Sequence, residues 1–175
     1  MQHHLAALAV QAAKAVVEQR PSGPLADPTR VKILTQTGGS MTDSALVTGL
    51  VLAKKRVSDR MPKQLPSGKI ALVDGGLERK ELMSNVKLYV SSTGVLESFR
   101  QKEKTVLLEQ IDHLVELGVT LLACKEGIDD DLHAALTEAG IQAYRRVSRA
   151  DLDLLARGTN ATLNNDVKGL TASDV

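Results

Sequence analysis

The 175 residues suffice for one medium domain, or one domain with part of another, and 43% hydrophobic with 25% charged residues is an ordinary globular mixture. A net charge of +1 and an aromatic content of 2% argue against a nucleic-acid partner, because there is no broad basic field and almost no stacking surface. One cysteine, Cys124, excludes an internal disulfide. No run approaches the roughly 20 apolar residues of a membrane span, and no signal peptide is recognisable, so we expect a cytoplasmic protein with no membrane partner.

The first third of the chain predicts a helix followed by two strands. Apolar residues recur every three or four positions over residues 2–20, until the prolines of "PSGPLADP" end the helix. The segment "RVKILTQTGGS" (30–40) predicts a short strand and a turn. The segment "SALVTGLVLAKK" (44–55) predicts a second strand, and a proline-punctuated loop follows.

The rest of the chain alternates between strand and helix patterns. This alternation predicts an α/β fold, in which helices flank a β-sheet core. The change of rhythm also predicts a molecule of two parts with a hinge near residues 47–56. The expected strands are 69–73, 85–90, 119–127, 141–147 and 161–165, the expected helices are 94–118, 129–139 and 148–160, and a polar tail follows.

Three adjacent aspartates, Asp129, Asp130 and Asp131, open one of the predicted helices. Carboxylates at a helix amino terminus accept hydrogen bonds from free N–H groups and face the positive end of the helix dipole. A metal site would need further ligands converging from other segments, and none is evident. We therefore interpret the aspartates as helix caps and expect no metal.

No catalytic constellation is recognisable in the sequence. The histidines His3, His4, His113 and His133 have no acid or nucleophile at a suggestive spacing and are interpreted as solvated, and Cys124 as a small buried hydrophobe. The glycine pairs in "QTGGS" and "VDGGL" match neither a phosphate loop nor a dinucleotide fingerprint and predict turns. The chain is therefore not expected to be an enzyme.

The long predicted helix is unusual in its first half. In "ESFRQKEKT" (97–105) the only large apolar residue is Phe99, whereas the following "VLLEQIDHLVEL" is densely apolar. A helix that is polar all round for two turns projects into solvent. Either this half is simply an exposed end, or it is a protruding arm whose Val95, Leu96 and Phe99 contact another protein.

Several ordered signatures resemble the apical domain of the group II chaperonins, the family of the archaeal thermosome and the eukaryotic cytosolic ring chaperonin. "GGSMTDSALVTGLVLAKKRVSDRMPK" is similar to the entry into that domain, and "KIALVDGGLE" to its "KIALLDAPLE" strand. The block from "EKTVLLEQ" to "ARGTNAT" (103–162) resembles the family almost without gaps. The resemblance implies a chaperonin apical fold with a helical protrusion, plus a partial α+β intermediate segment.

The resemblance also implies a division of the chain into domains. Residues 1–48 correspond to part of the intermediate domain, 49–165 to the apical substrate-binding domain, and 166–175 to a tail returning towards the intermediate domain. The family's equatorial domain, with its "GDGTT" phosphate loop, has no counterpart here. We therefore expect no cofactor for this chain, although the full-length family uses ATP and magnesium.

The function implied by the resemblance is that of a module that binds unfolded protein within an ATP-dependent chaperonin. Its partners would be non-native client proteins and, in a full-length ring, sister subunits. The protrusion with Val95, Leu96 and Phe99 would act as a built-in lid. The implied client-binding residues are Glu109, Asp112, His113, Glu116, Leu132, His133, Leu136 and Thr137, the two leucines only where they are not buried.

Two other functions stay open from the sequence. An α/β unit commonly binds a small ligand or nucleotide at the carboxyl ends of its strands. A chaperonin-like domain can also serve as a protein-docking module within a larger protein.

Overall fold

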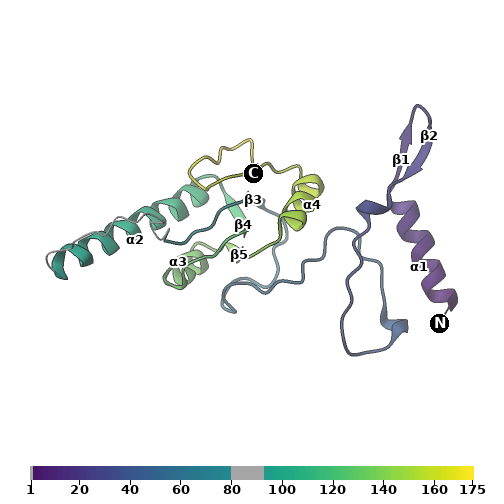
Figure 1. Ribbon diagram of the computed structural model, residues 1–175, viewed down its shortest axis with the longest axis horizontal. Coiled ribbons are helices and arrows are strands. Elements are labelled where there is room, and N and C mark those ends of the chain that lie inside the picture. The colour runs from purple at the N-terminus through teal and green to yellow at the C-terminus, as the bar shows by residue number, and fades with distance from the viewer. Residues whose placement is uncertain (1, 80–92) are drawn as a thin grey trace, which may run out of the picture. The chain divides into compact units, whose positions relative to one another are not determined.

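The computed structural model describes residues 2–79 and 93–175, and for 93–97, 99 and 100 it describes the backbone alone. The chain forms two compact units, Met1–Ala53 and Lys54–Val175 (Figure 1). We call them unit 1 and unit 2 and describe each by itself. The boundary lies within residues 47–56, where the change of sequence pattern predicted it.

Unit 1 begins with a helix and a hairpin. The helix α1 spans Gln2–Ala15, and the strands β1 (Val17–Arg20) and β2 (Gly23–Ala26) pair antiparallel around a two-residue turn. The prediction of a helix as far as residue 20 was therefore wrong at its end. The adjacent β-branched residues Val16 and Val17 suit a strand as well as a helix, and the proline that follows favours the tight turn.

The two strands predicted for residues 30–40 and 44–55 do not form. Apart from the short 3₁₀ turns Pro28–Arg30 and Met41–Asp43, residues 27–53 have no regular structure. An alternating apolar pattern becomes a strand only when its N–H and C=O groups find a neighbouring strand. The described residues provide no such neighbour for these segments.

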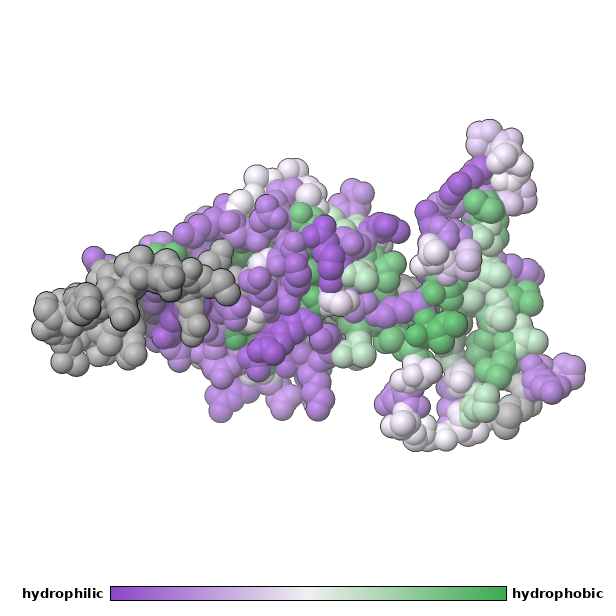
Figure 2. All heavy atoms as spheres, in the orientation of Figure 1, coloured by the Kyte–Doolittle hydropathy of each residue, from purple (hydrophilic) through white to green (hydrophobic). Residues whose placement is uncertain are grey.

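Unit 1 has no closed core of its own. No side chain among the described residues 2–53 is fully buried, and Ile33 is 83% exposed. Figure 2 shows hydrophobic residues of unit 1 at its surface. The large hydrophobic residues exposed in unit 1 are Leu5, Val10, Val17, Leu25, Ile33, Leu34, Met41, Leu46, Val47 and Val51.

Unit 2 is built on a four-stranded parallel sheet in the order β5-β4-β3-β6. The sequence predicted each of these strands, although the predicted bounds for the last three were too long. Parallel strands must be covered on both faces, and accordingly the side chains of the two central strands are mostly buried. The strands are β3 (Lys69–Val73), β4 (Val119–Cys124), β5 (Gln142–Tyr144) and β6 (Leu163–Asn164).

Three helices cover the two faces of this sheet. The helices α2 (Thr93–Glu116) and α3 (His133–Glu138) contact each other and pack on β4 and β5, whereas α4 (Arg149–Thr159) contacts β3 and β6 (Figure 1). The side chains of β3 follow this division. Ala71 and Val73 join the core cluster beneath α2 and α3, whereas the intervening Leu72 is buried outside that cluster.

The core cluster lies between the sheet and the helices α2 and α3. It includes Leu107 and Leu114 of α2, and Leu136 of α3. Cys124 at the end of β4 is fully buried, and burial raises the pKa of its thiol to about 12. The thiol is therefore protonated at neutral pH, which confirms its interpretation as a small hydrophobe.

Two helix ends in unit 2 are as predicted. Ser148 caps α4, where its hydroxyl accepts a hydrogen bond from the backbone N–H of Asp151 at 3.2 Å. Just beyond the end of α2, Gly118 takes a φ of +74°, a left-handed conformation that glycine adopts without strain. Gly76, in the predicted turn after β3, lies so close to Gly127 that a Cβ there would collide with the Gly127 carbonyl.

Residues 166–175, predicted as a polar tail, pack onto unit 2. Val167 and Leu170 are buried in its core, and Val175 packs partly against the same cluster. The backbone N–H of Thr162 donates to the carbonyl of Asp174 at 2.9 Å. The prediction missed this packing because two isolated apolar residues in a polar segment give no periodic signal.

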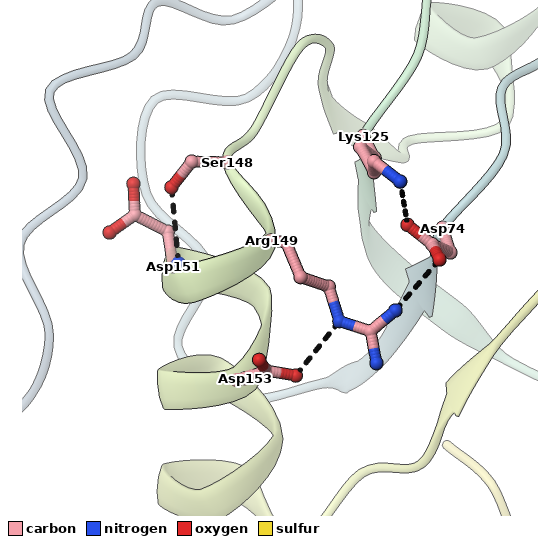
Figure 3. Close-up of polar contacts among 6 residues, drawn as sticks. All are labelled: Asp74, Lys125, Ser148, Arg149, Asp151 and Asp153. Atoms are coloured by element: carbon pink, nitrogen blue, oxygen red, sulfur yellow. Dashed lines mark hydrogen bonds and ion pairs between the residues drawn. The ribbon is translucent and has the colours of Figure 1, made fainter.

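An ion-pair network closes the carboxyl end of the sheet (Figure 3). Asp74 follows β3 directly, and its two carboxylate oxygens lie 2.7 Å from Lys125 Nζ and 2.7 Å from Arg149 Nη1. Arg149 Nε also lies 3.1 Å from Asp153 of α4. The hydrogen bond from Lys125 is the main cause that lowers the pKa of Asp74, and the charge of Arg149 adds to it. Asp74 thus joins two strands to the start of α4.

No helix among the described residues combines the length and the apolarity that a membrane crossing requires.

We expect Asp74→Asn to lower the melting temperature of unit 2 near neutral pH and to weaken its dependence on acid. A carboxyl group with a lowered pKa contributes stability above its unfolded-state pKa of about 3.9, and that contribution is lost as the pH falls through the lower folded-state value. Thermal unfolding followed by circular dichroism from about pH 7 to about pH 3 measures both effects. Asp59→Asn is the control, because Asp59 is exposed and shows no ion pair within the described residues. If the melting temperatures of Asp74→Asn and wild type change with pH by the same amount across this range, the proposed role of Asp74 is contradicted.

We expect amide hydrogens in residues 2–45 to exchange faster than those in 119–147. The first segment has no buried side chain, whereas the second contains the central strand β4 and much of the core. Hydrogen exchange followed by mass spectrometry of the whole chain measures the difference. Equal protection of the two segments would show that unit 1 is as stable as unit 2.

Candidate functional site

The outward side of α2 presents side chains that the core does not use. Leu107, Ile111 and Leu114 point into the core, whereas Glu109, Asp112 and Glu116 are exposed. Val115 is 50% exposed on the same helix, one turn after Asp112. Together with Val106 it is one of the two large hydrophobic residues exposed in the described part of unit 2.

The short helix α3 is more deeply set than the sequence suggested. Leu132 and Leu136 are fully buried, so their assignment to a client-binding surface is wrong and they belong to the core. His133 and Thr137 are half-buried, and the Thr137 hydroxyl donates to the His133 carbonyl at 2.7 Å. Of the residues considered for α3, Glu138 is the one that is fully exposed.

The three aspartates before α3 pair with arginines instead of capping the helix. The predicted single helix is a 3₁₀ turn, Asp130–Leu132, followed by α3, and neither has a side-chain cap hydrogen bond. Arg79 Nη2 lies 2.7 Å from Asp131, and its Nε lies 3.3 Å from Asp129. From the other side, Arg145 lies 3.1 Å from Asp130.

These pairs position α3 relative to the strand ends. The backbone N–H of Asp129 donates to the Leu77 carbonyl at 2.8 Å, so the chain after β3 holds the start of α3 through both backbone and side chains. The capping prediction failed because arginines from other segments pair with the carboxylates. Arg79 lies far before them in the sequence, and Arg145 lies beyond the next strand, β5. No spacing rule connects residue 79 with residue 131.

His113 is not simply solvated as predicted. Its Nε2 lies 3.0 Å from the carbonyl of Leu170, and its Nδ1 lies 4.0 Å from a Glu116 oxygen. His113 therefore ties α2 to the C-terminal segment. Val106, Glu109, Gln110, His113 and Lys168 line a hollow of about 340 Å³ between these two elements.

A larger hollow of about 510 Å³ lies beside the carboxyl ends of β3 and β6. Its walls carry both signs of charge, including Glu78, Lys102 and Lys168, over an apolar floor at Val106 and Leu107. Its lining residues also include Arg79 after β3 and Glu103 and Gln110 of α2.

The charged residues at the carboxyl ends of the strands pair with one another. Asp74, Lys125 and Arg149, which a ligand at the carboxyl ends of β3 and β4 would meet, are engaged with one another. Within residues 2–79 and 93–175, no group of three or more His, Cys, Asp and Glu residues could hold a metal ion.

The first half of α2 matches the predicted protrusion in its backbone. The helix continues beyond the sheet (Figure 1), and Gln101, Lys102, Glu103 and Thr105 are exposed. The side chains of Val95, Leu96 and Phe99, and the strand predicted for 85–90, lie outside the described residues. The lid residues therefore stay a prediction.

The TCP-1/cpn60 chaperonin family model matches residues 1–175 of this chain. The chain is 34% identical over 172 residues to the thermosome subunit alpha of Archaeoglobus fulgidus, covering 98% of this chain and 32% of that protein. It is also 34% identical over 172 residues to a thermosome subunit of Pyrococcus horikoshii, with 98% and 31% covered.

A solved structure shares the fold. The open-state monomer of a group II chaperonin from Methanococcoides burtonii superimposes with a TM-score of 0.77 and 29% sequence identity, over 97% of this chain and 36% of that one. The chain thus spans about a third of the length of these relatives. The family model matches the whole length of the chain and the curated relatives match nearly all of it. The chain therefore belongs to the TCP-1/cpn60 chaperonin family.

Proposed function

We propose that unit 2 is the module of a group II chaperonin that binds non-native protein, and that the outward sides of α2 and α3 form its client-binding face. We define this face by the residues Glu109, Asp112, His113, Val115, Glu116, His133, Thr137 and Glu138. The family membership supports the chaperonin assignment. The apical role is our own inference from this geometry.

The observation that carries the proposal is that α2 has one buried side and one exposed side. One side of the helix supplies Leu107, Ile111 and Leu114 to the core, and the other leaves Val115 half exposed among carboxylates. A single exposed valine is common on protein surfaces, so the support comes from its position and not from its exposure alone. Here it lies on the pair of helices that share one face of the sheet.

The remaining assignments follow from the same proposal. Unit 1 would be part of the intermediate domain, and its exposed apolar residues are consistent with a need for further covering. The first half of α2 would form the lid. In a full-length subunit the partners would be sister subunits in a cytoplasmic ring, and ATP hydrolysis with magnesium would be a property of the whole subunit.

The alternatives are less well supported. A small-ligand site at the strand ends conflicts with the ion pairs that occupy Asp74 and Arg149. A docking module would use the same helices but would bind a folded partner. Binding of a denatured protein in preference to its native form distinguishes the proposed function from the docking module.

We expect the chain to suppress aggregation of a chemically denatured client only at a large molar excess. A ring presents many such faces at once, and a lone module loses avidity by about 10²-fold or more. Light scattering of the diluted client, with the chain added at increasing ratios, measures this activity.

Replacing the exposed valine of this face, Val115→Asn, should weaken holding by about fivefold, because the lost apolar contact is worth roughly 1 kcal/mol. The matched control Val10→Asn removes a comparably exposed valine of unit 1 and should hold the client as well as wild type. Circular dichroism checks that each variant stays folded. An effect of the control without an effect of the test variant would place client binding in unit 1. His133 and Thr137 are poorer targets, because their internal contacts would change as well.

We expect no saturable binding of ATP with magnesium. Phosphoryl chemistry needs a phosphate cradle, a metal-binding carboxylate and a group that positions water in one place, and no such set is recognisable in the described residues. Isothermal titration calorimetry of the intact chain tests this. Saturable binding at micromolar affinity would contradict the proposed function.

A further inference from the structure

We propose that the client segments bound by the α2–α3 face are basic: they carry lysine or arginine beside aliphatic side chains. This inference rests on the proposed function and specifies the chemistry of its client. It follows from the sign of the charges on the face and from the position of the exposed valine among them.

The charge on the face has one sign. From Thr105 to Leu117 and from Asp129 to Ala139, the two helical segments contain no lysine or arginine. Within the described residues, no lysine or arginine forms an ion pair with the four exposed carboxylates. These carboxylates are Glu109, Asp112, Glu116 and Glu138.

Most cations near the face are already engaged. Arg79 and Arg145 pair with the aspartates that precede α3. Lys69 donates to the carbonyl of Leu117 at 2.9 Å, at the end of α2. Lys168 lines the same hollow as Glu109, so it could compete with a basic client for that carboxylate. The exposed carboxylates are therefore largely uncompensated from within unit 2.

An apolar contact lies among these charges. Val115 is one turn from Asp112 and adjacent to Glu116, and the partly buried Leu108 lies one turn before Asp112 on the same stripe. A client side chain that covers Val115 would bring its neighbours within reach of Asp112 and Glu116. A lysine or arginine there gains an ion pair, whereas a glutamate there is repelled.

The expected effect is moderate and depends on salt. Two exposed ion pairs together change affinity by about twofold to thirtyfold. The screening length falls from about 10 Å at 0.1 M salt to about 3 Å at 1 M. The preference for basic segments should therefore largely disappear at high salt, while the apolar contribution remains.

Two fluorescent synthetic peptides test the proposal. Both carry the same leucines and valines, one with lysines and the other with glutamates at the intervening positions. Fluorescence anisotropy with the intact chain at low and high salt should show tighter binding of the lysine peptide at low salt only. The test variant is Asp112→Asn/Glu116→Gln, which should lose about twofold to thirtyfold in affinity for the lysine peptide.

The matched control is Asp59→Asn/Glu126→Gln, which removes the same two charges from exposed positions outside α2 and α3. It should bind the lysine peptide like wild type. Equal binding of both peptides, or equal losses in test and control variants, would overturn the inference and leave the proposed function standing. If neither peptide binds and the chain also fails to hold a denatured client, both the inference and the proposed function are overturned.

Discussion

The burial of a parallel sheet on both faces is the constraint on which unit 2 depends. β3 and β4 pair in parallel and have mostly buried side chains, so each face of the sheet needs a cover of helices. α2 and α3 provide one cover, and α4 provides the other. Asp74 ties the sheet to α4 at the strand ends, because its carboxylate pairs with Lys125 after β4 and with Arg149 at the start of α4.

This arrangement explains how the outward sides of α2 and α3 can serve another purpose. Their inner leucines already meet the needs of the core, so the outer residues can vary in charge and exposure with little effect on folding. Arg79 and Arg145 pair with Asp129, Asp130 and Asp131 just before α3. Under the proposed function, the outer surface of these helices would make many weak contacts with unfolded chains.

Unit 1 follows a different logic. Its helix α1 has no buried residue, and the irregular segment 27–53 also exposes large apolar side chains. The apolar residues of unit 2 are mostly enclosed by its own strands and helices, and those of unit 1 are not. Unit 1 by itself therefore leaves exposed the kind of apolar side chain that unit 2 encloses in its core.

The sequence by itself determined the alternation of strands and helices in unit 2, since periodicity and glycine or serine at the helix ends are local properties. It also determined the buried state of Cys124 and the family, because the matching block runs in register over long stretches. It could not determine whether 30–40 and 44–55 would be strands, because a strand exists only with a partner. Only the tertiary structure decided that Leu132 and Leu136 are core residues, that Arg79 claims the aspartates, and that Val167 and Leu170 close the core. Each of these depends on contacts between residues far apart in the chain, for which no local spacing gives a signal.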